Sequence, residues 1–208
     1  MQNPDIDHIE RSRQYRSELS AASAVPGTSL VVYERGHGTA LMIAAAAAQA
    51  GAKTALFVVP KLAQELYLDQ LRRMGFTASA ASGKKGAIEE ICRQAAAYQD
   101  GKPAIFIAAP NDMVKAGHWC DAWKQQTPFG FVAVLDAENF RNMNSEKNQG
   151  LKDVITRAGN AVLLVGHDTD PVKTRALARA WDLHIVTILP RPAHAVASGC
   201  EAMAMDAD

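Results

Sequence analysis

The sequence predicts an α/β protein built on a mostly parallel β-sheet with helices on both faces. The chain has 208 residues, of which 48% are hydrophobic, enough to bury the core of one domain. Its short apolar segments are continuous rather than alternating, which is typical of strands covered on both faces. Strand and helix segments alternate along the chain, a pattern that predicts right-handed crossovers between parallel strands.

The elements follow in a regular order. We expect an N-terminal helix over residues 5–22, ended by Pro26-Gly27, and then a strand over 29–33. A helix is expected over 39–50, with Gly51 as the residue that follows its C-cap. The later segments predict strands at 54–59, 77–81, 104–108, 131–135, 161–165 and 184–188, and helices at 62–74, 87–98, 151–158 and 171–181.

Three parts of the chain are expected from these elements. They are an N-terminal helix (1–26), a single domain (27–192) and a flexible C-terminal tail (193–208). The longest apolar run, residues 40–48, is about half as long as a membrane span requires, and we identify no export signal. The three cysteines, Cys92, Cys120 and Cys200, form no CxxC pair, so a reducing cytoplasm is the expected location.

Charge limits the classes of partner. The chain has 22 Lys and Arg against 22 Asp and Glu, and its formal net charge is zero. A strongly basic coat is therefore excluded, and any contact with nucleic acid must be local.

Ligands of parallel α/β sheets bind beyond the carboxyl ends of the strands. The loop after the first strand contains Gly36, His37, Gly38 and Thr39, and it suits a turn that cradles phosphate at a helix N-terminus. A working phosphate-binding loop has lysine and a hydroxyl residue where this chain has Thr39 and Ala40. A tight strand-to-helix turn explains the loop equally well.

A second candidate position is Asp136, which directly follows the strand 131–135. An apolar strand that ends in aspartate resembles a Walker B arrangement, in which the carboxylate holds Mg²⁺ through water. Ala137 stands where a catalytic glutamate is usual, and Glu138 comes one residue late, so its side chain is expected to point in a different direction. A strand-end aspartate is also common as a cap.

From about residue 30 to 192 the chain resembles the first RecA-like lobe of a superfamily 2 helicase, and within that superfamily it is most similar to the RecQ-like DNA helicases. The segments that carry the resemblance occur in the order of the family's motifs. They are Leu30-Val31-Val32 before the phosphate loop, Val59-Pro60 with Asp69-Gln70-Leu71 and Gly75 (motif Ia), residues 107–113, residues 134–139 (the Asp-Glu-Ala-His box), residues 164–168 (motif III) and residues 188–192 (the exit from the lobe).

The departures from that pattern determine the expected function. Besides the missing phosphate-loop residues, Ala137 and Asn139 replace the catalytic glutamate and the histidine of the box. The adenine-reading glutamine is not evident, although Gln14 is close, and the chain ends soon after the first lobe. Each lost electrostatic contact costs roughly 10² to 10³ in rate. We therefore expect no enzyme activity, no cofactor and no bound metal.

The leading hypothesis is a pseudo-helicase that acts as a binding, assembly or regulatory subunit in a DNA-associated process. One alternative is a residual nucleotide binder or ATPase that needs a partner, in which Gly36, Gly38 and Asp136 hold phosphate weakly. A metal site of His37 and His167 with Asp136 or Asp168 is a weaker alternative than polar side chains that fill a vacated pocket.

A further alternative is a binder of single-stranded DNA. The resemblance places Lys61 and Asn111 on the path of that strand, and Lys84 lies in the basic loop Gly83-Lys84-Lys85-Gly86. Salt-sensitive affinity would be expected of such contacts.

Trp119 and Trp123 lie four residues apart and share one helical face. Packing is the simpler interpretation, and a patch for a protein partner or for self-association is the functional one. The N-terminal helix is the other candidate for that surface. No membrane contact is expected.

Overall fold

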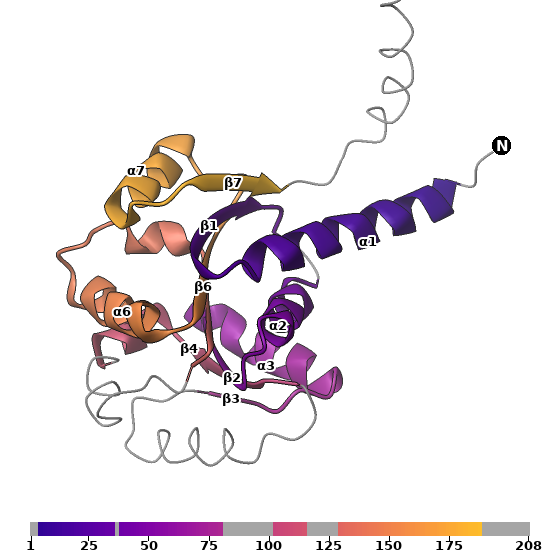
Figure 1. Ribbon diagram of the computed structural model, residues 1–208, viewed down its shortest axis with the longest axis horizontal. Helices are drawn as coiled ribbons and strands as arrows, with labels where there is room; N and C mark the ends of the chain where they lie inside the picture. Colours follow the sequence, from indigo (N-terminus) through magenta and orange to yellow (C-terminus); the bar gives the residue numbers. More distant parts are fainter. Residues whose placement is uncertain (1–3, 36–37, 81–101, 116–128, 189–208) are drawn as a thin grey trace, which may run out of the picture.

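The computed structural model describes residues 4–35, 38–80, 102–115 and 129–188 (Figure 1). Within these residues seven strands form one sheet in the order β3-β4-β2-β5-β6-β1-β7, and every paired strand is parallel to its neighbour. The strands are β1 (Gly27–Tyr33), β2 (Thr54–Val58), β3 (Ala78–Ala80), β4 (Ala104–Ala108), β5 (Phe131–Leu135), β6 (Asn160–Gly166) and β7 (Ile185–Ile188).

Helices cover both faces of this sheet. The described α-helices are α1 (Pro4–Ser23), α2 (Thr39–Gln49), α3 (Gln64–Arg73), α6 (Glu146–Arg157) and α7 (Pro171–Trp181), and short 3₁₀ helices are η1 (Lys61–Ala63), η2 (Pro110–Lys115) and η3 (Ala137–Phe140). Among the described helices, none is long and apolar enough to cross a bilayer.

The core has two halves, one on each side of the sheet. Leu19 of α1, Ile43 of α2 and Leu71 of α3 are buried in one hydrophobic cluster, whereas Leu151 of α6 and Leu177 of α7 are buried in the other. Successive strand residues alternate between the two clusters, as the geometry of a strand requires. This explains why the strands are apolar along their whole length.

Most of the expected elements are confirmed with small shifts at their ends. The strand 104–108, the strand 131–135 and the helix 171–181 have the predicted bounds. The helix predicted over 151–158 was placed too late, because α6 begins at Glu146. The helix predicted over 87–98 and the tail 193–208 lie outside the described residues.

The sheet order determines which loops can meet. Strands β5, β6 and β1 are consecutive neighbours, with Leu135 paired to Leu164 and Gly166 paired to Tyr33. Because all three are parallel, the residues that follow them emerge at one edge of the sheet. The candidate site lies at this carboxyl edge.

Candidate functional site at the carboxyl edge of the sheet

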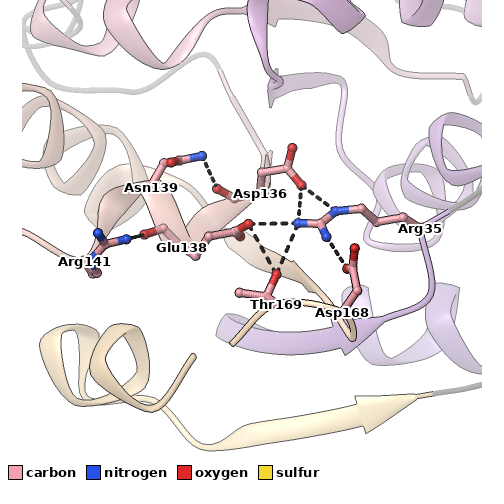
Figure 2. A network of polar contacts seen from close by, with 7 residues as sticks. All are labelled: Arg35, Asp136, Glu138, Asn139, Arg141, Asp168 and Thr169. Atoms are coloured by element: carbon pink, nitrogen blue, oxygen red, sulfur yellow. Dashed lines mark hydrogen bonds and ion pairs between the residues drawn. The ribbon is translucent and has the colours of Figure 1, made fainter. Parts of the chain in front are cut away.

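Arg35, two residues after β1, lies at the centre of the site (Figure 2). Its Nε donates a hydrogen bond of 2.8 Å to Oδ1 of Asp136, and its Nη2 lies 2.8 Å from Oε1 of Glu138. Its Nη1 forms an ion pair with the carboxylate of Asp168. One guanidinium thus joins the loops that follow β1, β5 and β6.

Thr169 completes this arrangement. Its hydroxyl oxygen accepts a hydrogen bond of 3.3 Å from Nη2 of Arg35, and the hydroxyl donates one of 3.3 Å to Oε1 of Glu138. We call Arg35, Asp136, Glu138, Asp168 and Thr169 the Arg35 cluster. The side chain of Glu138 is 15% exposed, that of Arg35 34% and that of Asp168 61%, so the cluster runs from a nearly buried acid to one in solvent.

The local backbone explains why two carboxylates of one loop reach the same guanidinium. Asp136 has left-handed angles, φ 50° and ψ 46°, which are rare for a residue other than glycine. They turn the chain directly from β5 into η3. This turn brings the side chains of Asp136 and Glu138 to Arg35, while Ala137 between them is buried. Asp136 makes no side-chain cap bond, so the capping interpretation was wrong.

Hydrogen bonds from two α-helices hold the 3₁₀ helix η3 in place. The carbonyl oxygen of Phe140 accepts hydrogen bonds from Nδ2 of Asn148, at 2.5 Å, and from Nε1 of Trp181, at 3.1 Å. Asn148 belongs to α6 and Trp181 to α7. Both helices therefore hold the turn that presents Glu138.

Gly166, the last residue of β6, leaves room for the guanidinium. A Cβ atom at this position would overlap with Nη1 and Cζ of Arg35 and with Oδ1 of Asp168. The backbone of Gly166 does not have a positive φ, so a larger residue is excluded by the packed side chains and not by the strand conformation. Gly166 thus accommodates the guanidinium of Arg35.

The charges of the cluster do not balance. One guanidinium faces three carboxylates, and Oε2 of Glu138 is buried with no hydrogen-bond partner. Partial burial lowers the pKa of Arg35. The hydrogen bond that Arg35 donates to Asp136 and the negative charges of Asp136, Glu138 and Asp168 raise it by more, so that its pKa is raised overall. Arg35 is a permanent cation, and the surplus negative charge disfavours a phosphate group at this point.

Thr39, in the place of the phosphate-loop lysine, is buried beside Tyr67 of α3. Burial raises the pKa of Tyr67 to about 12, the charge of Asp136 adds to the rise, and a hydrogen bond between the side chains of Tyr67 and Thr39 opposes it. Burial likewise raises the pKa of Tyr33, with smaller contributions from Tyr67 and Asp136. The start of α2 thus packs against phenol groups that stay protonated at neutral pH.

The other predicted site residues fall in several places. Gly38 has φ 103° and is the N-cap of α2, without a side-chain cap bond, while Gly36 and His37 lie outside the described residues. Lys61 and Asn111 are exposed and follow the neighbouring strands β2 and β4. Lys84, Trp119 and Trp123 lie outside the described residues.

The metal hypothesis finds no support in the described part of the chain. No group of three His, Cys, Asp or Glu side chains there is placed to hold a metal ion. His167 is exposed, and Asp136 and Asp168 are bonded to Arg35. Sequence reasoning missed Arg35 itself, for which the absent lysine and the unusual glycine at the motif III position were the available signals.

No protein-family model matches the chain, and no curated protein matches it by sequence. Solved structures do match. The helicase domain of Pyrococcus furiosus Hef has a TM-score of 0.61 with this chain, at 15% identity over 86% of it. The Sulfolobus solfataricus SWI2/SNF2 ATPase core, solved in complex with dsDNA, has a TM-score of 0.56, at 9% identity over 88% of this chain.

The chain has the fold of a RecA-like helicase lobe. The seven-stranded parallel sheet and these similarities confirm the expected fold class and the resemblance to helicase and ATPase domains. The chain spans 38% of the Hef helicase domain and 44% of the SWI2/SNF2 core. At such low identity the similarity concerns the fold, and the RecQ-like assignment stays a prediction.

Proposed function

We propose that this chain is a non-catalytic RecA-like module that acts as a binding, assembly or regulatory subunit in a DNA-associated process. The observation that carries the proposal is Arg35, whose guanidinium is bonded to Asp136, Glu138 and Asp168. A Walker B aspartate must be open to the water shell of Mg²⁺ if it is to serve in hydrolysis. Here that carboxylate already has a cation from its own chain.

Three further features support the same proposal. The lysine position of the phosphate loop holds Thr39, which is buried beside Tyr67 and cannot supply a positive charge. Gly166 accommodates the guanidinium. The cluster also carries more negative than positive charge, which disfavours a nucleotide phosphate.

The first experiment is calorimetric titration of the purified chain with Mg-ATP and Mg-ADP, with light scattering to measure its mass. We expect no binding heat up to millimolar nucleotide, together with a defined oligomer or a protein complex. Clear nucleotide binding would contradict the proposal and favour the residual nucleotide binder.

A variant tests whether Arg35 is what keeps Mg²⁺ away from the carboxylate of Asp136. In Arg35→Ala the carboxylate of Asp136 loses its cation and is open to the water shell of Mg²⁺, so millimolar Mg²⁺ should raise the melting temperature by about 3 °C, whereas the wild type should not respond. Arg141→Ala is the matched control, because Arg141 donates to the backbone oxygen of Glu138 and to none of the three carboxylates. An equal Mg²⁺ response in all three proteins would contradict the role assigned to Arg35.

Direct DNA binding is a second candidate, favoured by one observation. Lys61 and Asn111 are exposed at the same edge of the sheet, since β2 and β4 are neighbours and the amide of Val59 donates to the carbonyl of Ala108. Affinity for a single-stranded oligonucleotide should then fall with salt, and Lys61→Gln should reduce the slope of log K against log[salt] by about 0.7. Glu65→Gln, one turn further along, is the matched control.

A further inference from the structure

The C-terminal half of helix α1 is anchored to the domain. Leu19, Ser20 and Ser23 in its last two turns are buried, and the hydroxyl of Ser20 donates a hydrogen bond of 3.2 Å to Oε1 of Gln49 in α2. The N-terminal half projects beyond the body of the molecule, on the side toward which the arrow of β7 points (Figure 1). The middle of the helix lies against the loop that follows β1, which carries Arg35.

Tyr15, near the middle of α1, contacts the loop that carries Arg35. Its hydroxyl donates a hydrogen bond of 3.1 Å to the carbonyl oxygen of Glu34 and accepts one of 2.9 Å from the amide of the same residue. One side chain thus satisfies both backbone groups of the residue immediately before Arg35. Burial raises the pKa of Tyr15, although its hydrogen bond with Glu34 acts in the opposite sense, so the phenol keeps its proton at neutral pH.

We propose that α1 controls the Arg35 cluster through Tyr15. With α1 docked, the hydroxyl holds the backbone of Glu34 where Arg35 can reach the carboxylates that follow β5 and β6. When α1 moves, Glu34 loses both bonds and Arg35 leaves the three carboxylates. The helix is thereby a regulatory element that closes the site.

This proposal rests on the geometry of the Arg35 cluster and not on the absence of catalysis. It is tested without nucleotide, so its failure and the failure of the proposed function are distinguishable. An ATPase and a scaffold could each have such a helix.

The test measures how readily phenylglyoxal modifies Arg35, by peptide mass spectrometry on the full chain. The exposed Arg175 of α7 is the internal reference. In Tyr15→Phe the ring is kept and only the two bonds to Glu34 are lost, so modification of Arg35 should become about fivefold to tenfold faster relative to Arg175. Gln14→Ala is the matched control, since Gln14 is exposed on the same helix and donates to Glu18.

An unchanged rate in Tyr15→Phe, or an equal increase in Gln14→Ala, would overturn the proposal. A second measurement uses the wild type alone and so does not depend on the folding of a variant. Hydrogen exchange followed by NMR should show the amide of Glu34 and the Nε–H of Arg35 opening together, at urea concentrations below global unfolding. Arg35 that stays protected after the amide of Glu34 has exchanged would also overturn it.

Discussion

Replacement of Gly166 by alanine should break the Arg35 cluster without touching any of its members. The added Cβ would overlap with the guanidinium of Arg35 and with the carboxylate of Asp168. Both groups are ends of flexible side chains, so they can move aside and the strand can stay intact. The expected result is a folded protein in which the guanidinium no longer lies over β6.

The magnitude follows from two opposing terms. Charge-assisted hydrogen bonds of a buried group are worth about 1.5–3 kcal/mol each. Arg35 is 34% exposed and Asp168 61% exposed, so solvent screening reduces the loss of the whole cluster to about 2 kcal/mol. Alanine also lowers the entropy of the unfolded chain, which stabilises the protein by about 0.4–1 kcal/mol. The net destabilisation should be about 1–1.5 kcal/mol.

A double-mutant cycle with Arg35→Ala separates these terms, with urea unfolding as the assay. Without the guanidinium, Gly166→Ala should no longer destabilise and should add about 0.4–1 kcal/mol of stability. The coupling energy should therefore be about 2 kcal/mol. A Gly166→Ala variant that loses the same stability in both backgrounds would refute the reasoning, because its effect would then have nothing to do with Arg35.

Three other predictions concern stability, again measured by urea unfolding. Glu138→Gln should cost about 1.5 kcal/mol and Asp168→Asn about 0.5 kcal/mol, because Glu138 is 15% exposed and Asp168 61%; equal losses would contradict this ranking. The pKa of Tyr67 is raised from 10.0 to about 12, so its contribution is complete below pH 10 and is lost as the pH rises to 12. Tyr67→Phe should accordingly flatten the decline over that range, and an unchanged decline would assign it to other groups. Asn148→Ala should cost about 2 kcal/mol, since Asn148 is fully buried and donates to the carbonyl of Phe140; a loss below 0.5 kcal/mol would mean that a water molecule replaces the amide.

Much of the fold could be predicted because burial on two faces leaves a simple pattern. The strand Phe131–Leu135 is wholly buried, so its apolar run coincides with the strand itself. The helix α6 shows where this logic fails. Its first turn is polar, and Gly150 and the buried Asn148 interrupt the apolar spacing. The sequence pattern therefore begins only at Leu151, five residues after the helix does.

The position of the site could be predicted from the sequence, but the ion pairs that Arg35 makes there could not. The loop after β1 and Asp136 were chosen because carboxyl ends of parallel strands converge. Arg35 lies 101 residues from Asp136 and 133 residues from Asp168 in the sequence. An arginine next to glycine in a loop has no periodicity to mark it, and only the folded sheet brings it to its partners.

The cluster also explains how three acidic side chains can lie close together without destabilising the fold. Three carboxylates at one edge of a sheet repel one another, so without a cation they would destabilise the fold. In this chain the cation is the guanidinium of Arg35, which is charged at every accessible pH. Arg35 offsets the repulsion among these acids, and in doing so it makes the site depend on the position of one loop. Because Tyr15 holds that loop, stability at the carboxyl edge and the placement of α1 are linked.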